Sequence, residues 1–121
     1  MLVVTLLSAQ EGKKSLIPLI GSDAPAFTAE TTNGTLNFPG DYGKSWKILF
    51  SHPQDFTPVC TTEIMELARQ QEAFKAMGVE VAVISTDTKE RHLMWKKSME
   101  EILSLEKGQP RIGFPLIDDS K

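Results

Sequence analysis

Cysteine is almost absent from this 121-residue chain, whose only one is Cys60. A single thiol excludes a disulfide within the chain, a CxxC redox pair and a cysteine-based zinc site. It also favours a reducing compartment, so we expect a cytoplasmic protein. Histidine is scarce too. The two histidines lie far apart in the sequence without nearby acid pairs, so we expect no metal.

Positive charge is not in excess, because the formal net charge is −3 and the lysines are scattered. Nucleic acid is therefore not expected as a partner. No glycine-rich phosphate-binding loop is present, and we expect no cofactor. The apolar run at residues 2–7 is too short to cross a bilayer and has no basic region before it. We therefore expect neither a membrane partner nor a secretory signal.

The composition that remains is that of a single globular domain, with 40% hydrophobic and 24% charged residues. Residues 2–7 are open to three interpretations: an extra strand, a disordered lead or a start-site artefact. We favour the disordered lead, since residues 10–14 have the composition of a loop. Residues 1–16 are thus predicted to be a flexible extension and residues 17–121 to form the domain.

The pattern predicts two strands, then alternating strands and helices. Residues 24–32 and 35–38 are predicted to form a hairpin around a type I′ turn at Asn33-Gly34. Residues 40–43 are a predicted loop, and residues 48–50 a central strand that is apolar on both faces. A helix over residues 64–77, with Gly78 as its C-cap, precedes a strand over residues 79–84.

A second helix is predicted from an N-cap at Asp87 to about Leu105, with an apolar stripe that includes His92, Trp95 and Ile102. Residues 107–110 end it, and residues 114–117 form a last strand. Helical crossovers between strands predict an α/β fold with a mainly parallel sheet.

Cys60 stands where the strand that ends near Phe50 passes into the first helix. Pro53 and Pro58 stiffen the backbone before it and keep the residues that precede them out of helical angles. The helix is therefore expected to begin at about Val59, with Cys60 in its first turn. A thiol near unpaired helix N–H groups tends to ionise, and the thiolate is the nucleophile.

Each of these residues also has an ordinary structural interpretation. A lone cysteine is usually a small buried hydrophobe. Pro53 can be a strand terminator, Thr57 a helix-entry residue, and Glu63 an acid that complements the helix dipole. His52 fits a strand-end histidine bonded to a backbone group. His92, on the apolar stripe, fits a core histidine better than a ligand.

The spacing Pro53-x-x-x-Thr57-x-x-Cys60 resembles the active-site motif of the peroxiredoxins. The longer match from His52 to Glu63 is similar to the one-cysteine class and its archaeal and bacterial relatives. Weaker resemblance extends over residues 20–118. It implies a thioredoxin-like fold in its peroxiredoxin variant, with an N-terminal β-hairpin.

The resemblance also implies roles for the residues of the motif. Cys60 would attack the peroxide and become a sulfenic acid, and Thr57 would orient the substrate. Pro53 would shield the sulfur from water, and Glu63 would hold a catalytic arginine. His52 and Val59 would line the pocket.

One departure from the family pattern concerns that arginine, which the family places on a strand beyond the segment that matches residues 114–118. None of Arg69, Arg91 and Arg111 lies at a matching position. The resemblance therefore implies that the chain is the N-terminal part of a longer protein, lacks the C-terminal strands and is weakly active alone.

The partners implied are a peroxide, which is hydrogen peroxide or a small organic hydroperoxide, and an external thiol. That thiol could be thioredoxin-, glutaredoxin- or glutathione-like. A homodimer or larger homo-oligomer is expected. Two other functions stay open: a thioredoxin-like disulfide reductase, disfavoured by the lone cysteine, and a redox-sensing or chaperone-like module without efficient turnover.

Overall fold

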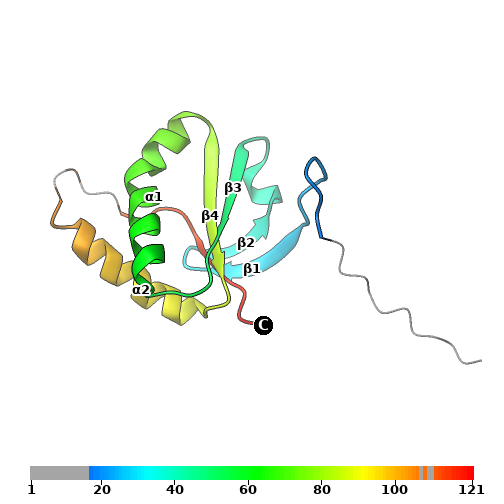
Figure 1. The fold of residues 1–121 in the computed structure, drawn as a ribbon. Helices are drawn as coiled ribbons and strands as arrows, with labels where there is room; N and C mark the ends of the chain where they lie inside the picture. Colours follow the sequence, from blue (N-terminus) through cyan, green and yellow to red (C-terminus); the bar gives the residue numbers. More distant parts are fainter. Residues whose placement is uncertain (1–16, 107, 109–110) are drawn as a thin grey trace, which may run out of the picture.

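The computed structural model describes residues 17–106, 108 and 111–121, which form one sheet and two helices (Figure 1). The predicted flexible extension at residues 1–16 lies outside the described residues, as does most of the predicted break at residues 107–110. The elements follow the chain in this order: β1 (Phe27–Thr31), β2 (Gly34–Phe38), the 3₁₀ helix η1 (Gly40–Tyr42), β3 (Trp46–Ser51), α1 (Pro58–Ala76), β4 (Val79–Ser85), α2 (Lys89–Leu103) and β5 (Leu116–Asp118).

The sheet has the strand order β2-β1-β5-β4-β3. β3, β4 and β5 are parallel, while β1 is antiparallel to both β2 and β5. The two helices cover one face, and the β1–β2 hairpin curls toward the other (Figure 1). The predicted α/β class and order of elements are therefore confirmed.

Two apolar clusters lie on the two faces of the sheet. Val81 and Val83 of β4 pack with α1 and α2, whereas Ala82 packs with the hairpin residues Leu36 and Phe38. This alternation follows from the two-residue period of a strand. β4 is thus buried on both faces and is the centre of the core.

The hairpin forms as predicted, but its turn is one residue earlier. Thr31 pairs with Gly34, so Thr32 and Asn33 form the loop. Gly34 has a φ of 99°, while Asn33 is not in the left-handed region. The Thr31 hydroxyl explains the shift, since it accepts from Asn33 N–H and donates to the Gly34 carbonyl.

β3 was predicted to be central, and within the described residues that prediction is wrong. It pairs with β4 alone and forms one edge of the sheet. Several of its apolar side chains are exposed to solvent: Trp46 is 79% exposed, Ile48 36% and Leu49 39%. An apolar run marks a strand but does not say how many strands flank it.

Both helices begin at different residues from those predicted. α1 starts at Pro58, one residue early, because proline is tolerated at the first helical position. It ends at Ala76, and Gly78 follows with a φ of 73°. Neither α1 nor α2 has the length and hydrophobicity needed to cross a membrane.

The predicted N-cap at Asp87 is wrong. Thr88 caps α2, with its side-chain oxygen accepting from Arg91 N–H, and the carboxylate of Asp87 pairs with other groups. His92 and Trp95 are buried as expected, but Leu103 rather than Ile102 completes the stripe. The last strand, β5, starts two residues later than predicted.

We expect the open edge of β3 to make this chain self-associate as concentration rises, because an unpaired apolar strand edge accepts another chain. Leu49→Lys should weaken the association, since a charge on an edge strand opposes pairing. Light scattering over a dilution series measures it. Met77→Lys, at an exposed residue beyond α1, is the control. Equal association of both variants with the wild type would show that the β3 edge is not the contact.

Candidate active site

The loop between β3 and α1 is attached to the sheet at one end and bent in the middle. His52 N–H donates to the Ile84 carbonyl of β4 at 3.1 Å. Phe56 has a φ of 62°, the only positive value outside glycine in the described chain. That conformation is strained for a bulky residue and persists only where neighbours hold it. Here the Arg91 guanidinium lies 5.3 Å from the centre of the Phe56 ring.

Cys60 occupies the third position of α1, directly after this loop. It is a free cysteine, 9% exposed, and packs with Ile64 and Trp95 in the larger apolar cluster. Val59 beside it is 68% exposed. The thiol therefore lies just beneath the surface at the start of a helix, as the two prolines predicted.

Backbone N–H groups without intrahelical acceptors lie at the start of α1, beside Cys60. Pro58 has no N–H, and Thr61 N–H donates to the Thr57 carbonyl at 2.9 Å. The N–H groups of Val59 and Cys60 thus belong to the part of the helix that has no intrahelical acceptors. Thr57 adopts the N-cap conformation without making a side-chain cap, and its hydroxyl donates to the Gln54 carbonyl at 3.0 Å.

A buried carboxylate connects this loop to the rest of the domain. Asp55 is 1% exposed. His52 Nε2 lies 2.8 Å from its Oδ1, and His92 Nδ1 lies 2.6 Å from its Oδ2. Asp55 N–H donates to the Asp87 carboxylate at 2.6 Å. One loop residue is therefore bonded to α2 and to the turn that precedes α2.

The surroundings of His92 favour its positively charged form. Its Nε2 lies 3.0 Å from the Ile117 carbonyl, which can only accept, and its Nδ1 faces the carboxylate of Asp55. Both ring nitrogens must then carry protons. Burial lowers the pKa of His92, but the hydrogen bond and charge of Asp55 outweigh burial and raise it. Burial likewise raises the pKa of Asp55, but the bonds from His52 and His92 hold it below its usual range.

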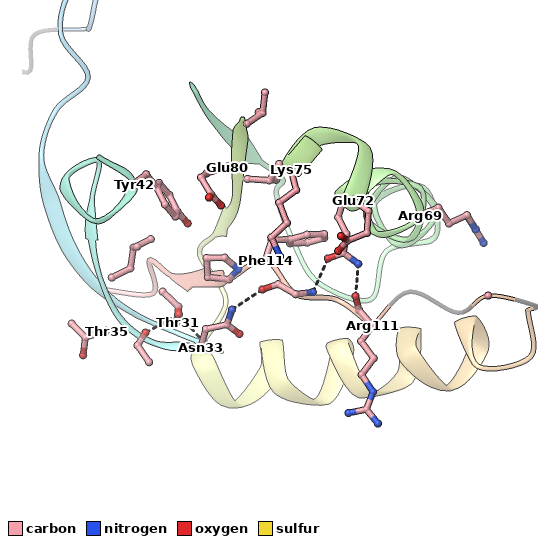
Figure 2. A pocket seen from close by; sticks show the side chains of 18 of the residues that line it. Thr31, Asn33, Thr35, Tyr42, Arg69, Glu72, Lys75, Glu80, Arg111 and Phe114 are labelled. Carbon is pink, nitrogen blue, oxygen red and sulfur yellow. Dashed lines mark hydrogen bonds between the residues drawn. The ribbon is translucent and has the colours of Figure 1, made fainter. Parts of the chain in front are cut away.

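A groove of about 910 Å³ lies away from these residues. It lies between the hairpin, the later turns of α1 and residues 111–115, and Tyr42, Glu72 and Lys75 line it (Figure 2). Cys60, Thr57 and Glu63 are not among its lining residues. Cys60 and Thr57 therefore lie at the opposite end of α1 from this groove.

The model of the AhpC/TSA family matches residues 20–121. The chain belongs to this family of peroxiredoxins. The resemblance inferred from the motif is thereby confirmed.

Individual relatives agree with the family match. A peroxiredoxin of Methanosarcina mazei is 51% identical over 107 residues, which cover 87% of this chain and 48% of the relative. A peroxiredoxin of Aquifex aeolicus is 43% identical, with coverage of 85% and 44%. The mitochondrial peroxiredoxin PRX1 of Saccharomyces cerevisiae is also 43% identical, with coverage of 84% and 37%. The chain thus spans about half the length of the curated peroxiredoxins it matches.

Solved structures show the same fold. A yeast mitochondrial 1-Cys peroxiredoxin superposes with a TM-score of 0.78 at 42% identity, over 86% of this chain and 47% of the other. A cysteine-to-serine mutant of the Arenicola marina peroxiredoxin 6 gives 0.70 at 40% identity, over 79% and 42%. The predicted thioredoxin-like peroxiredoxin fold is confirmed.

The structure places the other predicted site residues without testing their roles. Pro53 and Glu63 are exposed, Pro53 in the loop and Glu63 on the second turn of α1. His52 is buried and directly follows β3, as the strand-end interpretation expected, but its ring pairs with a carboxylate and not with a backbone group, so that part of the interpretation is wrong. Its Nδ1 is buried without a hydrogen-bond partner among the described residues.

The described interactions of the three arginines are with groups other than Cys60. Arg69 pairs with Glu66 and Glu106, and Arg91 pairs with Asp87. Arg111 lines the groove of Figure 2. No described interaction therefore joins any of them to Glu63, the residue that the resemblance pairs with a catalytic arginine.

Sequence reasoning missed Asp55 as the residue that organises the site. The sequence shows no acid pair near either histidine, whereas in the structure both histidines bond to this one carboxylate. The signal was a single acid three residues after His52, inside the motif. Its second partner, His92, is 37 residues away, so only the fold reveals the bridge. The described residues contain no cluster of three or more His, Cys, Asp or Glu side chains suited to a metal.

Asp55→Asn is expected to lower the free energy of unfolding by about 3–5 kcal/mol near pH 5–6, because it removes one partner of a buried ion pair. Asp55 has a lowered pKa, so its contribution is lost as pH falls below about 4 and through its folded pKa. His92 has a raised pKa, so its contribution is lost as pH rises above about 6.5 and through its folded pKa. Urea unfolding at a series of pH values measures both limits.

The control is Asp23→Asn, at an exposed position outside the core. Its effect should be small at every pH. A stability difference for Asp55→Asn that stays constant from acid to alkaline pH would contradict the ion pair.

Proposed function

We propose that this chain carries the reactive cysteine of a thiol peroxidase that reduces hydrogen peroxide and small organic hydroperoxides. The observation that supports it most is the position of Cys60, the only thiol, at the third residue of α1 under free helix N–H groups. Those N–H groups can donate to the oxygens of a peroxide that lies beside the sulfur, and a cysteine attacks as its thiolate.

In the proposed reaction the Cys60 thiolate attacks one oxygen of the peroxide. A sulfur–oxygen bond forms with an electron pair of the sulfur, and the oxygen–oxygen bond breaks. The second oxygen leaves as hydroxide or alkoxide and takes a proton from water. Cys60 is oxidised to a sulfenic acid, the reversible first step of cysteine oxidation, while the peroxide is reduced.

Thr57 is suited to hold the peroxide because its hydroxyl has a defined direction. The Thr57 hydroxyl donates its proton to the Gln54 carbonyl. The lone pairs of the hydroxyl oxygen therefore remain free to accept a hydrogen bond from the O–H of a peroxide. The N–H groups of Val59 and Cys60 can donate to the peroxide oxygens. Together these groups would orient the oxygen–oxygen bond toward the sulfur.

The sulfenic acid needs an external thiol, since the chain has one cysteine. That thiol would form a mixed disulfide with Cys60 and release water, and a second thiol would restore Cys60. The structure of the yeast mitochondrial relative concerns resolution of a 1-Cys peroxiredoxin via glutathione/thioredoxin systems. We propose a reductant of this class, in a reducing cytoplasm, and a homo-oligomeric protein.

The described residues alone are expected to react slowly. A donor aimed at the leaving oxygen commonly contributes about 100–1,000-fold in rate. Each of the three arginines is bonded elsewhere or lines the distant groove. Cys60 would therefore attack without cationic stabilisation of the leaving group.

Cys60→Ser tests the proposal directly. This variant should keep the far-ultraviolet circular dichroism of the wild type and lose all peroxide consumption with a thiol donor. Thr57→Val should slow peroxide attack by about 10–100-fold, as misplacement of a substrate typically does. Stopped-flow oxidation measures the rate constants. Consumption of peroxide by Cys60→Ser at the wild-type rate would overturn the assignment of Cys60.

Oxidation of Cys60 by one equivalent of peroxide, without turnover by any thiol donor, would point instead to the redox-sensing module. Reduction of insulin disulfides would point to the disulfide reductase.

A further inference from the structure

The indole of Trp95 makes a hydrogen bond to the residue that follows the nucleophile. Its Nε1 donates to Thr61 Oγ1 at 3.1 Å, and Trp95 is fully buried. An indole N–H can only donate, so the Thr61 oxygen must accept. The Thr61 hydroxyl proton is then directed elsewhere, and the Thr57 carbonyl receives it at 2.7 Å.

Thr61 consequently makes two hydrogen bonds to the carbonyl oxygen of Thr57. This carbonyl accepts from Thr61 N–H at 2.9 Å and from Thr61 Oγ1 at 2.7 Å. The Thr57 hydroxyl donates to Gln54. The peptide group of Thr57, its side chain and the first turn of α1 thus form one hydrogen-bonded unit.

The Trp95 ring is buried against the loop that precedes Cys60. It lies 4.9 Å from the ring of His52 and 6.4 Å from that of Phe56, measured between centroids. His92, one turn earlier in α2, bonds to Asp55. A single buried side chain therefore touches the loop before Cys60 and the residue after it.

We propose that Thr61 and Trp95 are positioning residues for peroxide attack by Cys60. The Trp95 N–H fixes the Thr61 hydroxyl, and that hydroxyl fixes Thr57, the residue suited to orient the peroxide. Neither residue touches the reacting atoms. This inference rests on the proposed peroxidase function and adds two residues to its site.

The neighbouring Thr62 offers a matched control. It has the same side chain on the same turn, but it is exposed, and its hydroxyl donates only within α1, to Val59 at 2.7 Å and Pro58 at 3.4 Å. Replacing it by valine changes shape and polarity as Thr61→Val does, without cutting a bond to α2.

The experiment compares three variants of the chain: Thr61→Val, Thr61→Ser and Thr62→Val. Thr61→Val should lower the second-order rate constant for hydrogen peroxide by about 10–100-fold, the effect of a small misplacement at a reacting centre. Thr62→Val should stay near the wild-type rate. Thr61→Ser retains the hydroxyl and should recover most of the loss.

A second measurement separates positioning from loss of structure. Alkylation of Cys60 by iodoacetamide needs the thiolate and access but no oriented peroxide. Its rate should be the same in the wild type and all three variants. Trp95→Phe, which removes the N–H and keeps an aromatic ring, should reproduce the selective loss of the peroxide reaction.

The outcomes are distinct. If the wild type consumes no peroxide, the proposed function fails and this inference with it. If the wild type reacts and Thr61→Val reacts as fast as Thr62→Val, only the inference fails. A parallel change of alkylation and peroxide rates in Thr61→Val would show a structural role and overturn positioning.

Discussion

A carboxylate removed from water must have donors for both oxygens, and this requirement determines the surroundings of Cys60. Asp55 receives His52 on one oxygen and His92 on the other. An unpaired charge at this depth would cost several kcal/mol. The loop before Cys60 is therefore held in place by a histidine on α2. Helix α2 supplies none of the groups proposed to react, yet it positions the loop that leads to Thr57 and Cys60.

Two attachments to α2, one on each side of Cys60, give the site its rigidity. His92 holds Asp55 in the loop, and Trp95 holds Thr61 after the thiol. Between them the backbone passes through the strained Phe56 and starts a helix at Pro58. Reactive groups supported by regular elements hold their geometry better than groups on free loops.

Local sequence signals predicted the local structure well. Two prolines placed Cys60 in the first turn of α1, and β-branched runs marked β4. The errors arose where several groups compete for one role: Thr88 rather than Asp87 caps α2, because Asp55 N–H and Arg91 already engage the Asp87 carboxylate. Contacts between distant residues, such as His92 with Asp55 and Trp95 with Thr61, leave no periodic signal. The edge position of β3 depends on which strands lie beside it, which its own residues do not specify.

The measurement that tests this account most directly is the site of oxidation after one equivalent of hydrogen peroxide, determined by peptide mass spectrometry with a sulfenic acid trap. The five methionines of the chain are internal competitors, because thioethers are oxidised without a helix N-terminus or an oriented peroxide. The account predicts that the trap modifies Cys60 before any methionine is oxidised. Oxidised methionines beside an unmodified Cys60 would contradict it.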